Sequence, residues 1–368
     1  MLKRFEVENY KGFKDPLVLD LSAREYAFNK NLVKDGIVSK GIIYGKNGIG
    51  KSNLGIALFD IVLHLTDKER MPLQYLNDYP SLESDKEYAR FCYAFLFDED
   101  EVVYEYKKRD PFYLIEEKLT INGKTVVFYN YFDKQSNFID PGFAGNLKID
   151  LLDNKLSILK YIYRNTPTNE ESPFFKMMGF VDNMLWYRGL SEGNSYCGFS
   201  NGNAMLTEKL YEAGKKDEFQ AFLDENELHY DLEWRENNGI HELMVVFPSG
   251  KKAPFLSIAS TGTKSLLLYF FWSITAFNKI SFLFIDEFDA FFHYEAAEDI
   301  VLRLNSNKKF QSLITSHNTY LMQNKLTRPD CCFIMTQNKI TSLFNSTSKE
   351  IREAHNLEKM YLNGAFNE

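Results

Sequence analysis

The sequence predicts an α/β protein in which a largely parallel sheet carries an antiparallel β lobe and an inserted helical subdomain. Three observations support this fold class. Apolar strands alternate with helices in the C-terminal third, which is typical of a parallel sheet with crossover helices. Short alternating strands fill residues 90–129, and a more helical stretch with polar loops follows at 131–228.

The composition is that of a globular protein with one or two domains. The chain has 368 residues, of which 45% are hydrophobic and 15% aromatic, so it can bury a sizeable core. No stretch approaches the ~20 apolar residues that cross a bilayer, and the charged N-terminus lacks the apolar segment of a secretion signal. We therefore expect a cytoplasmic protein with no membrane partner. The net charge of −8 argues against a surface that binds nucleic acid everywhere, although a local basic patch stays open.

The N-terminal elements lead to a glycine-rich loop. Strands are expected at 2–7 and 17–21, and a third strand at 41–44 is followed by glycines and a helical pattern at 53–59. The strands of the lobe are expected at 91–97, 102–107, 113–121 and 126–129.

The remaining elements follow from the same patterns. Helices are expected at 156–164, 174–190, 204–226, 264–277, 295–305 and 349–362. Strands are expected at 230–235, 242–247, 281–285, 310–315, 332–336 and 340–343.

The glycine-rich loop carries the strongest chemical signal. It reads Gly45-Lys46-Asn47-Gly48-Ile49-Gly50-Lys51-Ser52, which matches the phosphate-loop pattern GxxxxGK[ST] between a strand and a helix. Backbone N–H groups of such a loop surround phosphate oxygens, and the helix N-terminus adds a positive dipole end. We expect this loop and Asn53 to bind ATP, with Lys51 reaching the β- and γ-phosphates as a catalytic residue and the Ser52 hydroxyl binding Mg²⁺.

A strand that ends in two carboxylates supplies the remaining chemistry. Residues 282–285 are apolar throughout and lead to Asp286 and Glu287. We expect Asp286 to hold Mg²⁺, directly or through water, and Glu287 to orient and activate the attacking water. The alternative, that both acids only cap the next helix, is the weaker interpretation because a phosphate loop is already present.

Two further segments are weaker signals. Ser260-Thr261-Gly262-Thr263 precedes a helix, where such residues serve either as caps or as an anion site. His317 follows the apolar strand at 310–315, where a lone histidine is usually a surface or capping residue. Both segments become informative because of the order in which they follow the phosphate loop along the chain.

The order of the phosphate loop, the Ser260–Thr263 segment, the strand that ends in Asp286-Glu287, and His317 resembles that of the ABC-type ATPase head of SMC-like, RecF-like and OLD-like proteins. The resemblance covers roughly residues 1–130 and 228–345. The resemblance implies an ABC-type P-loop NTPase head in which ATP is sandwiched between two subunits, hence a homodimer or a higher homo-oligomer. It implies that Ser260, Thr261, Gly262 and Thr263 form a divergent signature motif against the γ-phosphate held by a second subunit. His317 would be the catalytic switch histidine near the same phosphate.

The stretch from Glu287 to His293 also resembles the Glu-x-Asp/Glu-x-x-Leu-His stretch of the compact members of this family, whereas two other features depart from the family pattern. Asp289 and His293 would lie at the dimer seam, and a packing role for His293 stays open. The signature motif lacks the usual Leu-Ser-Gly-Gly form. No glutamine can be placed as the loop that links the sheet lobe to the ATP site.

The chain also resembles the compact stand-alone ATPases of bacterial anti-phage defence, such as PARIS-type and similar abortive-infection systems. The resemblance rests on the opening Phe5-x-Val-x-Asn-Tyr-Lys-Gly-Phe-Lys, the meander ending at 115–119 and the helical insertion. It implies an ATPase, converting ATP and water to ADP and phosphate, that acts as sensor and regulatory subunit. The partner would be a toxic effector, a nuclease or other toxin, from the same operon.

Two alternatives stay open. The first is a RecF-like ATPase clamp that binds DNA in repair, with basic runs at 107–109, 215–216 and 251–252 as candidate contacts. The second is a nucleotide-binding scaffold with little turnover.

We expect three parts along the chain. Residues 1–130 would hold the phosphate loop and the β lobe, residues 131–228 the helical insertion, and residues 229–368 the signature motif, the Asp-Glu strand and the switch histidine.

Overall fold

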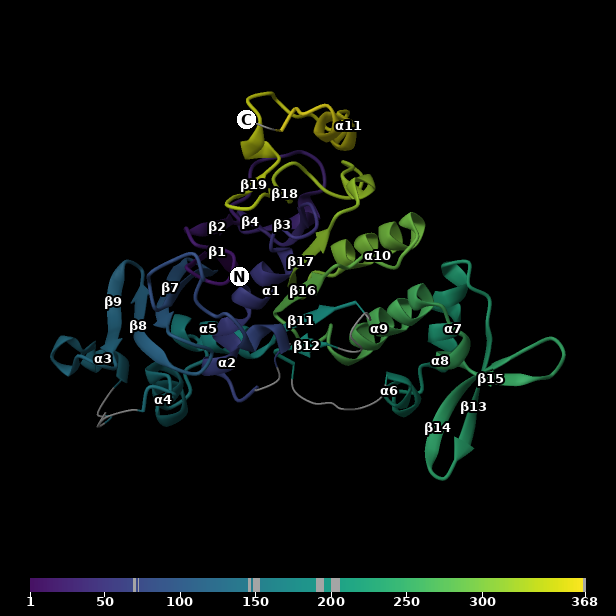
Figure 1. Cartoon of the computed structure of the whole chain (residues 1–368), viewed down its shortest axis with the longest axis horizontal. Coiled ribbons are helices and arrows are strands. Elements are labelled where there is room, and N and C mark those ends of the chain that lie inside the picture. The colour runs from purple at the N-terminus through teal and green to yellow at the C-terminus, as the bar shows by residue number, and fades with distance from the viewer. Residues whose placement is uncertain are drawn as a thin grey trace.

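The computed structural model describes residues 1–68, 71, 73–144, 147, 153–189, 195–199 and 206–366. Two seven-stranded sheets, one antiparallel and one mainly parallel, dominate the molecule. Figure 1 shows the antiparallel lobe with β8 and β9 at one end and the β13–β14 hairpin projecting at the other, with the parallel sheet between them. The predicted α/β class with an antiparallel lobe is confirmed.

The antiparallel sheet has the strand order β10-β9-β8-β7-β6-β1-β2. Its strands are β1 (Leu2–Glu8), β2 (Leu17–Asp20), β6 (Ala89–Phe97), β7 (Asp100–Lys108), β8 (Leu114–Ile121), β9 (Lys124–Asn130) and β10 (Phe138–Ile139). Strands β6 to β9 lie where the sequence predicted them. The N-terminal strand β1 joins the lobe by pairing with β6, so that Phe5 lies opposite Tyr93.

The second sheet has the order β12-β11-β16-β17-β5-β18-β19. Its strands are β5 (Lys40–Tyr44), β11 (Met184–Arg188), β12 (Tyr196–Cys197), β16 (Phe282–Asp286), β17 (Gln311–Ser316), β18 (Cys332–Met335) and β19 (Ile340–Ser342). The five inner strands run parallel, and β12 and β19 pair antiparallel at the edges. Because β5 and β16 both flank β17, the loop at 45–50 and the Asp286-Glu287 pair begin at the same edge.

The helices are α1 (Lys51–Leu58), α2 (Asp60–Leu65), α3 (Pro141–Ala144), α4 (Ile158–Asn165), α5 (Pro173–Asp182), α6 (Leu206–Glu212), α7 (Lys216–Glu225), α8 (Phe255–Ile258), α9 (Thr261–Thr275), α10 (Tyr294–Ser306) and α11 (Leu357–Leu362). The smaller sheets contain β3 (Val33–Lys34), β4 (Ile37–Val38), β13 (Asp231–Asn237), β14 (Ile240–Val246) and β15 (Lys252–Pro254).

Both faces of the parallel sheet are buried, because successive residues of its strands pack in two different apolar cores. On β16, Phe282 and Phe284 belong to the core that contains α1, whereas Leu283 and Ile285 belong to the core that contains α9 and α10. Helices α1 and α9 therefore cover opposite faces of the sheet.

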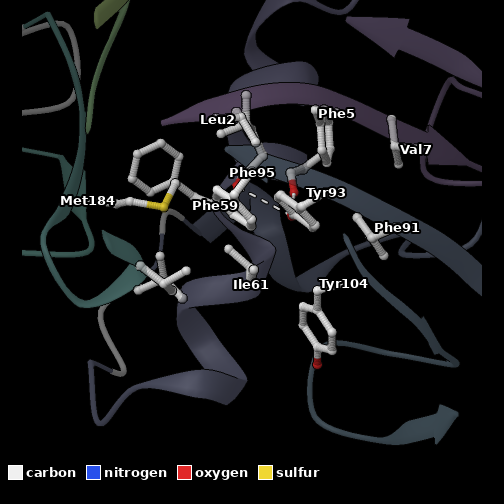
Figure 2. Close-up of a cluster of buried hydrophobic side chains, with 14 of the residues drawn as sticks. Leu2, Phe5, Val7, Phe59, Ile61, Phe91, Tyr93, Phe95, Tyr104 and Met184 are labelled. Atoms are coloured by element: carbon white, nitrogen blue, oxygen red, sulfur yellow. Dashed lines mark hydrogen bonds between the residues drawn. The ribbon is translucent and has the colours of Figure 1, made fainter. Parts of the chain in front are cut away.

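The core on the α1 side also joins the two sheets. Figure 2 shows Phe5, Tyr93 and Phe95 of the antiparallel sheet facing Phe59 and Ile61, which follow the glycine-rich loop in the chain. The Tyr93 hydroxyl donates a hydrogen bond to the Ala57 carbonyl at 3.0 Å. The lobe is thus packed directly on the helices that follow the glycine-rich loop.

Three helix predictions are wrong in part. The helix expected at 174–190 ends as α5 at Asp182, and residues 184–188 form β11 instead, because they pair in parallel with β16. The helix expected at 204–226, whose first two residues lie outside the described ones, is broken at Gly214, which has a φ of +64°. The helix expected at 349–362 begins only at Leu357, where Asn356 caps it.

Strand β11 lies inside the range expected as a helical insertion, and it belongs to the parallel sheet. The division into 1–130, 131–228 and 229–368 stays a prediction. None of the helices in the described part of the chain combines the length and apolar character that a membrane span requires.

Candidate nucleotide-binding site

The loop between β5 and α1 has the backbone that its glycines predict. Gly48 and Gly50 have φ angles of +81° and +101°, in the left-handed region that glycine adopts without strain. A Cβ atom on Gly50 would lie 2.9 Å from the Phe13 ring, and one on Gly45 would lie 2.9 Å from the Met335 carbonyl oxygen. Glycine is therefore required here for packing as well as for conformation.

The side chain of Lys51 folds back onto the backbone of this loop. Its ammonium group donates hydrogen bonds to the carbonyl oxygens of Gly45 at 2.7 Å and Lys46 at 3.0 Å. Burial lowers the pKa of Lys51, and the nearby charges of Asp286, Glu287 and Asp289 oppose that shift. The structure thus brings the lysine of the loop and the carboxylates beyond β16 into one electrostatic cluster.

Asp286 is fully buried at the end of β16 and keeps one carboxylate oxygen available. Thr315 on the neighbouring strand β17 donates a hydrogen bond to Oδ1 at 2.9 Å. Burial raises the pKa of Asp286, whereas a hydrogen bond from Ser52 and the charge of Arg188 lower it. Within the described residues, Oδ2 has no hydrogen-bond partner. The nearest cation to Oδ2 is Arg188, whose Nε lies 3.5 Å away. A buried carboxylate oxygen without a hydrogen bond, beside a serine hydroxyl, fits the oxygen ligands that Mg²⁺ prefers.

Glu287 leaves the strand in a left-handed conformation with a φ of +50°. Its backbone N–H donates a hydrogen bond to Thr315 Oγ1 at 2.8 Å, which fixes the backbone beside Asp286. Its side chain is 37% exposed, so water can reach the carboxylate. Glu287 therefore has the position and the access that activation of a water molecule requires.

The next carboxylate, Asp289, is buried and tied to β17. Ser316 donates a hydrogen bond to Asp289 Oδ2 at 2.7 Å. Burial raises the pKa of Asp289, and the hydrogen bond from Ser316 and the charges of His317 and Lys51 oppose it. His317 is exposed at the same edge of the sheet. Asp289 and His317 thus lie close to the cluster around Lys51.

The Ser260–Thr263 segment lies elsewhere. Ser260 caps α9, where its hydroxyl accepts a hydrogen bond from the Thr263 N–H at 3.1 Å. A cavity of about 590 Å³ opens at this helix end, and no residue of the 45–53 loop lines it. Its lining includes Ser260, Gly262, Thr263 and the exposed His293, which precedes α10. Within one chain the predicted signature motif is therefore separate from the predicted phosphate loop.

Two residues of the cluster were missed by sequence reasoning. Thr315 forms hydrogen bonds with both Asp286 and Glu287, and its place at the end of the expected strand 310–315 was the available signal. Arg188 forms an ion pair with Glu287 at 2.9 Å. It escaped notice because residues 184–188 were expected in a helix.

Comparison with known proteins agrees with this geometry. A family model described as "AAA domain, putative AbiEii toxin, Type IV TA system" matches residues 190–323, which is less than half of the chain. The match spans α9, β16 and β17 and includes the Asp286-Glu287 pair. A search of curated proteins found no match.

Several solved structures are similar over most of the chain. The SMC head domain from Thermotoga maritima shares 16% identity with a TM-score of 0.41, and 93% of this chain and 98% of that chain are covered. An SMC head bound to the C-winged helix domain of ScpA shares 15% identity with a TM-score of 0.44, and the coverages are 93% and 97%. RecF with ATP shares 14% identity with a TM-score of 0.40, and the coverages are 93% and 99%. The geometry of the glycine-rich loop and of the Asp286-Glu287 pair supports a P-loop nucleotide-binding site, and the partial family match to an AAA domain agrees with it.

Proposed function

We propose that this chain binds and hydrolyses ATP, dimerises around it, and acts as the sensor and regulatory subunit of a cytoplasmic bacterial anti-phage system of the abortive-infection type. It would control a separate toxic effector encoded in the same operon. The observation that carries the ATPase part is the convergence of Lys51, Ser52, Asp286 and Glu287 at one edge of the parallel sheet.

Each of these side chains has a distinct task in this proposal. Lys51 would exchange the carbonyl oxygens of its own loop for phosphate oxygens of ATP. Ser52 and Asp286 would hold Mg²⁺, which when bound offsets the negative charge on the phosphate oxygens. Glu287 would accept the proton of the attacking water, and Thr315 would keep its backbone in place.

A second copy of the chain completes the site in this proposal. Helices α1 and α9 cover opposite faces of the parallel sheet. No residue of the 45–53 loop lines the cavity at the cap of α9, which Ser260, Gly262 and Thr263 line. A head-to-tail dimer would bring them to the γ-phosphate of a partner, with His317, Asp289 and His293 near the seam.

The defence role is supported by the words of the family description, which names a toxin and a toxin–antitoxin system. Neither DNA binding nor an effector follows from the residues themselves. Co-purification with the product of the adjacent gene, and loss of phage protection in cells carrying Lys51→Ala, would be the expected results. Retained protection with Lys51→Ala would contradict the role of ATP in defence.

The DNA-clamp alternative draws less support from the residues that suggested it. Most of these basic side chains form ion pairs with carboxylates. The pairs are Lys107 with Glu116, Lys108 with Asp60, Arg109 with Glu87, Lys215 with Glu218, Lys216 with Asp217, and Lys252 with Glu233. A clamp would show DNA binding that weakens steeply with salt, and this measurement separates the two functions.

The decisive experiment compares Glu287→Gln and Lys51→Ala with the wild type. Glu287→Gln keeps the shape of the side chain but removes the base, so we expect kcat to fall by about 100-fold or more while ATP still binds. Lys51→Ala should lose ATP binding itself. Phosphate release measures turnover, and calorimetry measures ATP binding. A Glu287→Gln variant that hydrolyses ATP at the wild-type rate would refute the assignment of the base.

A further inference from the structure

Strand β11 ends at Arg188, directly beside Asp286, the last residue of β16, and Glu287, which follows it. The register of the parallel pair places Arg188 opposite Asp286. We propose that Arg188 is a positioning residue for hydrolysis, which holds the Glu287 carboxylate in the orientation that activates water. This inference rests on the proposed ATPase function.

The guanidinium group of Arg188 contacts the carboxylates of both Glu287 and Asp286. Its Nη2 and Nε atoms lie 2.9 Å and 3.2 Å from the same oxygen, Glu287 Oε2. Nε also lies 3.5 Å from Asp286 Oδ2. A planar guanidinium can contact both carboxylates at once, whereas the ammonium group of a lysine acts as a single point charge.

The arginine is the rigid partner in this arrangement. Its side chain is 16% exposed, against 37% for Glu287. Its backbone is held on both sides, since β11 pairs with β16 and the Arg188 N–H donates a hydrogen bond to the Ser195 carbonyl at 3.2 Å. A partly buried arginine on a sheet strand therefore restrains a glutamate that would otherwise sample several rotamers.

The restraint leaves the reactive side of the glutamate open. The Nε and Nη2 atoms of Arg188 both contact Oε2, and within the described residues Oε1 accepts no hydrogen bond. The backbone of Glu287 is fixed independently through Thr315. With the backbone and one oxygen held, the second oxygen is presented to solvent in a defined direction, as a general base requires.

The test compares Arg188→Ala and Arg188→Lys with Arg90→Ala in the full chain. Arg90 is a matched control, because it also bridges two carboxylates, Glu6 and Glu105, but lies on β6 in the antiparallel sheet. We expect Arg188→Ala to lower kcat by about 10- to 100-fold while KM for ATP changes little. Arg188→Lys should recover only part of kcat. Guanidinium at tens of millimolar should restore turnover to Arg188→Ala and leave Arg90→Ala unchanged.

Each outcome decides the proposal. An unchanged kcat in Arg188→Ala would overturn it, and so would a raised kcat, which would make the ion pair an inhibitory lock. If Arg188→Ala fails to fold by circular dichroism, Arg188→Lys carries the test, and wild-type turnover in that variant would overturn the proposal. A wild-type protein without Glu287-dependent ATP hydrolysis would instead refute the proposed function, which is a distinguishable failure.

Discussion

At the scale of single residues, Gly262 shows how tightly the cap of α9 is packed. A Cβ atom at this position would lie 2.6 Å from the carbonyl oxygen of Phe291, a backbone atom that cannot turn aside as a side chain can. The sequence suggested this glycine only as part of a signature motif. The structure gives it a packing reason that holds whether or not nucleotide reaches it.

We predict that Gly262→Ala lowers the free energy of unfolding by about 1–3 kcal/mol, because the added methyl group must displace backbone. Gly179→Ala is the matched control, since Gly179 lies in α5 and a Cβ atom there meets nothing within 4 Å. That control should be neutral or stabilising by up to about 1 kcal/mol. Urea unfolding of both variants measures the difference. Equal stability of the two variants would contradict the steric argument.

Lys40, the first residue of β5, is a second informative residue. Its ammonium group donates a hydrogen bond to the Phe310 carbonyl at 2.6 Å and lies 4.1 Å from the centre of the Phe310 ring. Burial lowers the pKa of Lys40 to about 7. The unfolded chain keeps the ordinary lysine pKa of about 10.4, so it binds more protons than the folded chain between these values.

The stability of the wild type should therefore rise with pH across the window from about 7 to 10. Each pH unit contributes at most about 1.4 kcal/mol from this group. We predict that Lys40→Met removes this dependence, so that the wild type gains stability relative to the variant from pH 7 to pH 9. Urea unfolding at these pH values measures it. Parallel stability curves would show that Lys40 does not titrate in this range.

At the scale of elements, a buried polar cluster ties α2 to the antiparallel lobe. Asp60, the first residue of α2, accepts hydrogen bonds from Lys108 and Tyr106 of β7, both at 2.8 Å. The hydroxyls of Tyr75 and Tyr79 also donate to its carboxylate. Since α2 follows α1 almost directly, this cluster connects the helix of the phosphate loop with the lobe.

We predict that Lys108→Met lowers the free energy of unfolding by about 3–5 kcal/mol, because it leaves the buried charge of Asp60 without its cation. Lys124→Met is the control, since Lys124 pairs with Asp140 at the surface and should change stability little. Thermal and urea unfolding of both variants provide the comparison. A Lys108→Met protein as stable as the control would show that the tyrosine hydroxyls alone satisfy Asp60.

At the scale of the whole molecule, the opposite placement of α1 and α9 on the parallel sheet is the feature with the largest consequence. In the proposed dimer, the phosphate loop and the carboxylates would act from one chain, and the cap of α9 would come from the partner. Two defects should therefore complement each other only when they fall on different sides of the proposed composite site.

We predict that a mixture of Lys51→Ala and Ser260→Arg subunits recovers part of the ATPase activity that each variant lacks alone. A mixed dimer would retain one site with an intact loop and an intact cap. The control mixture, Lys51→Ala with Glu287→Gln, should stay inactive, because both defects affect the loop side of a site. Absence of recovery in the first mixture, with both variants folded, would contradict the shared site.

The sequence alone determined those parts of the site and the fold whose residues are adjacent in the chain. The loop at 45–52 depends on glycines, a lysine and a serine that are adjacent in the chain, so its position between β5 and α1 was predictable. The strands of the lobe and the apolar strand before Asp286 were predictable for the same reason, since period-two and fully apolar runs are local signals.

Only the tertiary structure decided which distant residues meet. Residues 184–187 are apolar and would suit a helix or a strand equally, and their pairing with β16 made them a strand. That pairing brought Arg188 to Glu287, and Lys108, which the sequence offered as a candidate DNA contact, is instead buried in an ion pair with Asp60. Contacts of this kind depend on sheet order and on the two faces of a sheet, which no local pattern in the chain contains.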